Sequence, residues 1–237
     1  MPNRINASQI KSEFDSVIAH ADTIEPQLAE RLRYISRWIK NTKPGSLTKK
    51  RDVLNLLIEV MQDAKIWLKL QDLNSEEKVE YHRKAESTPP EIYWYETLFP
   101  MWFSKLDPKL TIWTKKLMAG EFTNSDKLEI SGFADKFDEL GILIFYRYIL
   151  DLSMATDFLI NGSSKISLAV QITRSNPKML DEKQNNWKET LIYWDIRRGV
   201  LFSQSPNHPI RRSARVLFEL SDSLADDCYI VCISVDN

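Results

Sequence analysis

The sequence predicts an α+β protein, with a helical N-terminal region followed by an α/β domain that has a central mixed sheet. Two observations lead to this prediction. Apolar residues in the first half recur every three or four positions, as on one face of a helix. The second half instead contains short β-rich runs separated by helical segments. We place the helical region at 1–125 and the α/β domain at 126–237.

Composition limits the function before any motif is considered. The chain has 237 residues, of which 43% are hydrophobic and 27% are charged, so a packed core is expected and wholesale disorder is excluded. With only 6 glycines, a glycine-rich phosphate loop is disfavoured. The net charge is −1, so any nucleic-acid site has to be a local basic patch.

Helices account for the first half of the chain. Helical spacing of apolar residues is found over 10–39, 50–73 and 110–118. The polar segment 74–90 is the clearest linker-like stretch. The block 92–103 is dense in aromatic residues, which is more typical of a protein core than of a base-stacking platform.

The second half alternates between the two kinds of element. Helical spacing covers 133–152, 180–193 and 211–224, and β-rich runs cover 155–160, 166–173, 199–203 and 229–235. The order is therefore helix, strand, strand, helix, strand, helix, strand. Such alternation is typical of an α/β domain.

The cysteines and the N-terminus bear on the cellular compartment. Cys228 and Cys232 lie four apart in one apolar run, which on a strand is too far for an easy disulfide. We expect buried, reduced thiols. The N-terminus lacks the apolar core of a signal peptide, and no apolar run approaches the ~18 residues of a membrane span. We therefore expect a cytoplasmic protein with no membrane partner.

One predicted hairpin gathers polar residues on a single face. Pairing Ile160 with Ile166 places the apolar residues of both strands on one face of the hairpin. Asp157, Gln171 and Thr173 then share the opposite face. Because this face is not the core face, we expect truncation of its polar side chains to cost little stability.

Two interpretations of this polar face remain open. In the chosen register Asp157 faces Ala169 and lies diagonal to Gln171, so a carboxylate and an amide oxygen come within reach of one shared ion. Alternatively, Asp157 caps a strand edge, and Gln171 and Thr173 lie on an ordinary solvated face.

With these residues the segment resembles the PD-(D/E)XK nuclease superfamily, the restriction-endonuclease-like fold. That family pairs an Asp at the start of one strand with an acid-x-Lys tripeptide on the next. Here Asp157 stands in the first place and Gln171-Ile172-Thr173 in the second. Gln in the acid position is a variation that the family includes, whereas Thr in the lysine position is a departure. The resemblance covers roughly residues 133–235.

The resemblance implies hydrolysis of phosphodiester bonds with Mg²⁺ or Mn²⁺, since hard oxygen ligands hold a divalent cation that activates water. A lysine from the following helix would replace the one missing from the tripeptide, and of Lys178, Lys183 and Lys188 we prefer Lys188. The implied metal ligands are Asp157, Gln171, the carbonyl of Ile172 and Glu139, and the implied catalytic residues are Asp157, Gln171, Lys188 and Lys183.

Two basic clusters are candidate contacts to DNA phosphates. The first runs from residue 31 to 51 without an acidic residue, and the second lies in the α/β half. Their members are Arg31, Arg33, Arg37, Lys40, Lys43, Lys49, Lys50 and Arg51 in the first, and Arg197, Arg198, Arg211, Arg212 and Arg215 in the second. Charge runs are also typical of ordinary solvated faces.

The sequence thus predicts a Mg²⁺-dependent DNA endonuclease or a nuclease-like protein. For the helical region we consider binding of a protein partner. Two alternatives stay open. One is a catalytically inactive nucleic-acid-binding module on the same fold, and the other is a mostly helical protein-interaction protein whose strands serve only as structure. Metal-dependent cleavage of DNA distinguishes the first of the three, and salt-sensitive binding without cleavage distinguishes the second.

Overall fold

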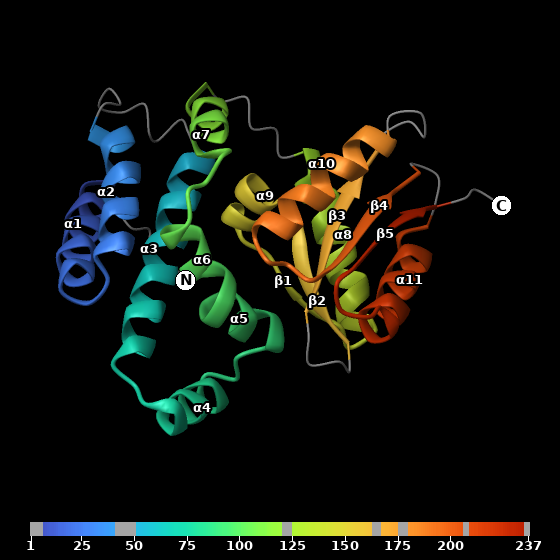
Figure 1. Cartoon of the computed structure of the whole chain (residues 1–237), viewed down its shortest axis with the longest axis horizontal. Coiled ribbons are helices and arrows are strands. Elements are labelled where there is room, and N and C mark those ends of the chain that lie inside the picture. Colours follow the sequence, from blue (N-terminus) through green and yellow to red (C-terminus); the bar gives the residue numbers. More distant parts are fainter. Residues whose placement is uncertain are drawn as a thin grey trace. The chain divides into compact units, whose positions relative to one another are not determined.

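The computed structural model describes residues 7–40, 51–119, 125–162, 167–174, 180–205 and 209–234 (Figure 1). The chain divides into two compact units. The N-terminal unit comprises Met1–Ser87 and Tyr95–Phe122, and the C-terminal unit comprises Thr88–Trp94 and Thr123–Asn237. Within the described ranges, none of the helices has the length and apolar character needed to span a membrane.

The N-terminal unit is helical, as the spacing of apolar residues predicts. Helix α1 packs against α2 and α3, and α2 packs against α6. The boundary between α1 and α2 falls at Pro26, which takes the first helical position because its missing N–H has no partner to lose there. The elements are α1 (Ala7–Ile24), α2 (Pro26–Lys40), α3 (Arg51–Gln71), α4 (Ser75–Lys84), the π-helical turn η2 (Trp94–Leu98) at the unit boundary, α6 (Phe99–Ser104) and α7 (Leu110–Ala119).

The segment expected to be a linker contains α4. Asn74 caps this helix by accepting hydrogen bonds from the backbone N–H groups of Glu76 and Glu77. In return, the Glu77 carboxylate accepts from the Asn74 N–H at 2.9 Å. This capping box satisfies the unpaired donors of the first turn. The Asn-x-x-Glu pattern of Asn74 and Glu77 is a signal for the start of a helix. The segment is nevertheless predicted as a linker because most of its residues are polar.

The C-terminal unit is built on a five-stranded sheet of order β1-β2-β3-β4-β5. Strands β1 (Leu143–Phe145), β2 (Phe158–Asn161) and β3 (Leu168–Thr173) pair antiparallel. Strands β4 (Arg198–Ser203) and β5 (Cys228–Ile233) continue the sheet in parallel. The sheet is therefore mixed, as expected, and crossover helices join its parallel strands.

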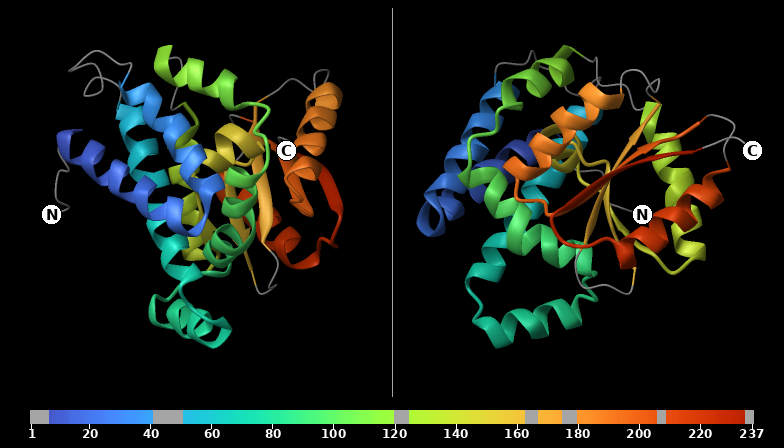
Figure 2. Two further views of the ribbon diagram at one scale, coloured as in Figure 1. Left: turned by 60° about the vertical axis from the view of Figure 1, so that its left-hand side comes forward. Right: turned by 45° about the vertical axis from the view of Figure 1, so that its right-hand side comes forward.

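Helices cover both faces of this sheet (Figure 2). One face packs through an apolar cluster that includes Phe158, Val170 and Phe202 against α8 (Ser125–Glu139) and α11 (Ile210–Ser223). The other face lies under α10 (Leu180–Tyr193). Here the sequence supplies Gly199, because a Cβ at this position would lie 2.4 Å from the Leu191 side chain. The two remaining helices of the unit are α5 (Pro89–Tyr93), which lies beside β1 and β2, and α9 (Tyr148–Met154).

The helical spacing over 133–152 is a wrong prediction in part. Helix α8 ends at Glu139, and the chain continues through β1 into the separate helix α9. Gly141 has a φ of 69°, a left-handed conformation that terminates a helix and favours glycine. The apolar residues of the short strand happen to continue the helical period, so the period alone does not reveal the break.

Candidate functional site

The side chains of Asp157 and Gln171 meet where β2 begins and β3 nears its end. The ladder pairs Ile160 with Leu168 and Phe158 with Val170, and the Gln171 amide donates to the Asp157 carboxylate from the same side of the sheet. The expected shared face is therefore confirmed. The expected register, which placed Ala169 opposite Asp157, is shifted by two residues. Such a shift leaves every side chain on its own face, because side chains alternate with period two.

The Asp157 carboxylate is buried, with a relative exposure of 3%. Its Oδ1 accepts a hydrogen bond from Nε2 of Gln171 at 2.8 Å, and its Oδ2 accepts from the backbone N–H of Ile172 at 2.6 Å. The expectation that truncating Asp157 costs little stability is therefore wrong. Its removal would leave a buried N–H without this acceptor, which costs about 1–3 kcal/mol.

The amide nitrogen of Gln171 lies between two oxygens. Besides donating to Asp157, it donates to the Ile172 carbonyl at 3.3 Å. The two acceptors are a carboxylate and a backbone carbonyl, both hard oxygen donors. A group with partial positive charge thus already occupies the point where these two oxygens converge.

A lysine reaches the same end of β3 from α10. The Lys183 ammonium donates to the hydroxyl of Thr173, whose side chain is buried. The structure does not bring the preferred Lys188 to this end of β3, because Lys188 is exposed and lies over the Tyr229 ring at 5.7 Å. Lys178 lies outside the described residues. Helix α10 runs back along the sheet from the carboxyl end of β3. Its first turn, with Lys183, therefore stays near Thr173, and Lys188 lies further along.

Polar groups that the sequence analysis missed follow β4 at this end. The Gln204 N–H donates to the Thr173 carbonyl at 2.8 Å. The Gln204 side chain is buried and accepts from the Ser213 hydroxyl at 2.7 Å. The sequence Ser203-Gln204-Ser205 at the end of the buried strand β4 could have indicated these residues. Ligands of α/β sheets bind outside the carboxyl ends of strands.

Glu139 is not brought to this cluster. It is the last residue of α8, which covers the opposite face of the sheet, and its side chain is exposed. Its carboxylate pairs with Lys136, and this hydrogen bond holds the pKa of Glu139 below its usual range. Glu139 therefore does not complete a ligand set with Asp157.

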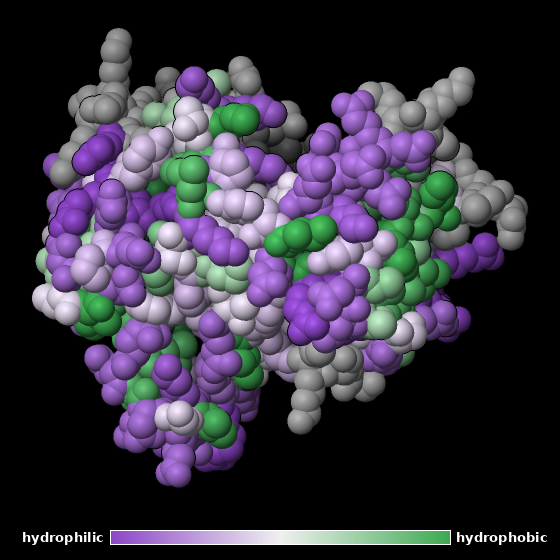
Figure 3. Space-filling model, in the orientation of Figure 1, coloured by the Kyte–Doolittle hydropathy of each residue, from purple (hydrophilic) through white to green (hydrophobic). Residues whose placement is uncertain are grey.

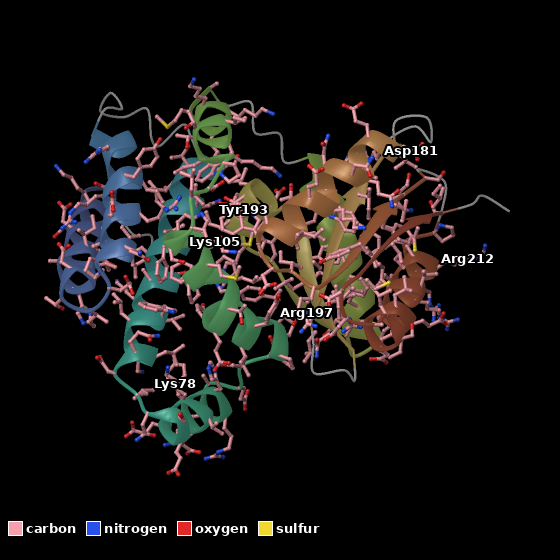
Figure 4. The ribbon with its side chains drawn as sticks, in the orientation of Figure 1. Lys78, Lys105, Asp181, Tyr193, Arg197 and Arg212 are labelled. Atoms are coloured by element: carbon pink, nitrogen blue, oxygen red, sulfur yellow. The ribbon has the colours of Figure 1, made fainter. Side chains whose placement is uncertain are left out.

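The second basic cluster contains one buried arginine and several exposed ones, of which Figure 4 labels Arg197 and Arg212. Arg198 is buried, donates to the Ser221 carbonyl at 2.8 Å, and has a pKa lowered by that burial. Arg197 is exposed and is bonded to Asp227 through two nitrogens at 3.0 and 3.1 Å. Three further arginines, on the first half of α11, are also exposed: Arg211, Arg212 and Arg215.

The first basic cluster is partly used within the N-terminal unit. Arg31 lies over the Trp102 ring at 5.3 Å and donates to the Lys105 carbonyl. Arg33 pairs with Asp22. Arg37 is exposed. Among the other predicted members, Lys43, Lys49 and Lys50 lie outside the described residues, and for Lys40 and Arg51 the structure describes the helical backbone alone.

Comparisons with known proteins leave the fold and the site without a counterpart. The chain matches no family model, no curated protein and no solved structure. Across the described parts of the chain, there is also no cluster of three or more His, Cys, Asp and Glu side chains that would hold a metal ion. Any cation at the hairpin would therefore need amide and carbonyl oxygens in addition to Asp157.

Proposed function

We propose that the C-terminal unit hydrolyses phosphodiester bonds of DNA with a divalent cation, Mg²⁺ or Mn²⁺. The observation that carries this proposal is the position of the Gln171 amide nitrogen, 2.8 Å from Asp157 Oδ1 and 3.3 Å from the Ile172 carbonyl. Two oxygens that attract a positive group there are also suitable ligands for a hard cation.

The donor set fits a cation when the Gln171 amide turns over. An amide carries its oxygen and nitrogen at equivalent ends, so a half-turn presents Oε1 where Nε2 now lies. Asp157, Gln171 and the Ile172 carbonyl would then hold the cation as three oxygen ligands. When bound, the cation lowers the pKa of a water molecule and screens charge on the phosphate.

Lys183 would supply the positive charge that the tripeptide lacks. Thr173 stands where the resembling family has lysine, and the Lys183 ammonium donates to its hydroxyl. An ammonium fixed beside a phosphate stabilises negative charge that grows in the transition state. The buried Thr173 hydroxyl holds this flexible side chain in place before substrate arrives.

DNA would be held through its phosphates by the exposed face of α11. Arg211, Arg212 and Arg215 lie on that face at the start of the helix. The helix follows the carboxyl end of β4, the end of the sheet at which Thr173 lies. Arginine contacts to phosphates are independent of base sequence and weaken with salt through counterion release.

A cleavage assay tests the proposal directly. Plasmid and single-stranded DNA are incubated with the full chain in Mg²⁺, in Mn²⁺ and in EDTA. Cleavage that requires the cation and is lost in Asp157→Asn is the expected result. The Asn variant keeps an oxygen for the Ile172 N–H, so the fold should persist, and circular dichroism checks it. Absence of metal-dependent cleavage on both substrates would overturn the hydrolytic role.

The burial of Asp157 favours a second candidate, a nucleic-acid-binding module without catalysis. Both carboxylate oxygens accept hydrogen bonds from the neighbouring strand, which is the arrangement of a structural clamp. For this candidate we expect salt-sensitive DNA binding that is weakened by Arg212→Gln, with no cleavage in any cation. A fluorescence anisotropy titration at two salt concentrations measures this binding.

A further inference from the structure

Strand β5 leaves a row of backbone groups unpaired along one edge of the sheet. It is the last strand in the order, and among the described residues no strand lies on its outer side. The Ser234 N–H donates to the Ser203 carbonyl, so even-numbered residues direct their backbone groups toward β4. Backbone groups alternate along a strand, so Tyr229, Val231 and Ile233 each direct an N–H and a C=O outward.

Within the described residues, strand β5 itself carries no charged residue or proline that would protect it against pairing. Natural edge strands are kept apart by lysine, proline, bulges or a covering element. The sequence Cys-Tyr-Ile-Val-Cys-Ile has neither charge nor proline, and Ile233 is 52% exposed. Figure 3 shows hydrophobic surface gathered over this part of the unit. At the other edge, β1 has only 3 residues and α5 packs beside it.

We propose that β5 pairs antiparallel with β5 of a second copy of this chain, about a two-fold axis at Ile230. In this register Tyr229 lies opposite Val231 of the partner subunit, and both residues use their outward backbone groups. Cys228 then lies opposite Cys232 of the partner subunit. The sheet continues from one copy into the other.

The spacing of the strand favours a second copy over an unrelated chain. Cys228 and Cys232 lie two residues on either side of Ile230, so a two-fold axis there matches each thiol with the other. The pair is of the type without mutual backbone hydrogen bonds, in which Cα atoms lie about 4.5 Å apart. That separation is within the range of a disulfide.

The charges of α11 are compatible with the same symmetry. The helix covers the face of the sheet that carries the two thiols. Its exposed basic residues lie in the first half, and its exposed acidic residues, Glu219 and Asp222, lie in the second. A two-fold axis runs the two copies of α11 antiparallel on one face, so like charges are kept apart. The exposed Val216 lies at the middle of the helix.

Cross-linking with the thiol oxidant diamide tests the register. The chain has 2 cysteines, which lie four positions apart, about 13 Å along a strand, so they do not bridge within one chain. Each new disulfide releases two protons and passes two electrons to diamide. Because burial raises the pKa of the Cys232 thiol, the reaction is run at mildly alkaline pH.

Single-cysteine variants make this test specific. Wild-type chain should form a covalent dimer, whereas Cys228→Ser alone and Cys232→Ser alone should not. An equimolar mixture of the two variants should form it again, because one thiol of each kind then meets across the axis. A covalent dimer from either variant alone, or none from the mixture, would overturn the proposal.

Sedimentation of the reduced chain tests the edge without relying on thiols. Strand pairing alone makes a small interface, so the dimer should dissociate on dilution. Ile233→Asp should weaken association at least tenfold, because in this register residue 233 lies opposite Asp227 of the partner subunit and like charges repel. The control is Ile192→Asp on α10, where the isoleucine is 55% exposed against 52% for Ile233, and it should change nothing. A wild-type chain that stays monomeric when concentrated, or equal effects of the two variants, would overturn the proposal.

Discussion

The two units both bury carboxylates, and they use them differently. In the N-terminal unit, Asp63 accepts from the Tyr95 hydroxyl at 2.8 Å, and Asp107 accepts from the Trp113 indole at 3.1 Å. Each of these bonds joins an acid to an aromatic donor. In the C-terminal unit, Asp157 instead accepts from an amide and a backbone N–H, and further along β3 the Thr173 hydroxyl accepts from Lys183.

This difference follows from the two architectures. In the helical unit, Asp63 and Asp107 each accept a hydrogen bond from one aromatic donor carried by a helical segment. Adjacent strands end side by side, so several polar types gather at one edge of a sheet. A mixed set of groups is what proton transfer and charge stabilisation require. Under the proposed function, the chemistry takes place at the hairpin, and the buried acids of the N-terminal unit stabilise the fold.

The largest expected effect is the loss of DNA cleavage when Lys183, the lysine that lies beside Thr173, is substituted. Lys183→Met keeps the aliphatic bulk and removes the charge beside Thr173, so DNA cleavage should fall by about 10²–10³. Lys188→Met, on the same helix, should leave the rate unchanged. Initial cleavage rates in Mg²⁺ measure both variants. Equal rates for the two variants would remove Lys183 from the site.

A second carboxylate at the hairpin should strengthen cation binding. Gln171→Glu places two acids together, so Mn²⁺ affinity should rise about tenfold or more, which corresponds to ~1.4 kcal/mol. In EDTA the repulsion between the carboxylates of Asp157 and residue 171 should lower the melting temperature of the variant, and Mn²⁺ should restore it. Calorimetric titration measures the affinity. The control is Gln71→Glu in the N-terminal unit, and an equal gain there would contradict a specific site at Gln171.

Loss of a structural pair should separate stability from activity. Tyr95→Phe removes the hydroxyl that donates to buried Asp63, and the lost bond to a charged group costs about 1.5–3 kcal/mol of unfolding free energy. Urea denaturation measures this loss. Cleavage and DNA binding, measured well below the unfolding transition, should not change. A parallel loss of activity would show that the two units do not divide the work as the comparison suggests.

The smallest expected effect belongs to the exposed pair of Arg197 and Asp227. The hydrogen bond from Arg197 holds the pKa of Asp227 below its usual range. Because the folded-state pKa is lowered, the pair stabilises the fold above the ordinary Asp range and loses this contribution as pH falls through the lowered pKa. Arg197→Gln should therefore lower the melting temperature slightly at neutral pH, and not at low pH or high salt. A difference that persists in high salt would indicate another role for Arg197.

Local patterns in the sequence predict much of this architecture. The predicted helix over 180–193 coincides with α10, and the alternation of apolar residues predicts that Asp157 and Gln171 share a face. Register is harder, because a shift of two residues preserves the faces and alternation cannot detect it. The choice between Lys183 and Lys188 depends on the direction in which α10 returns along the sheet. That direction is set by long-range packing, which periodicity does not encode.

Gly199 links this packing to the chemistry. Its Cα touches α10 so closely that an added methyl group would meet both Leu191 and Trp187, at 2.4 and 2.9 Å. The helix that rests on this bare stretch of backbone is the one that carries Lys183. The absence of a side chain at Gly199 therefore sets how closely α10 packs on the sheet. In this way Gly199 determines the position of the Lys183 ammonium group without contacting it. A residue that has no side chain thus determines how far the Lys183 side chain extends toward Thr173.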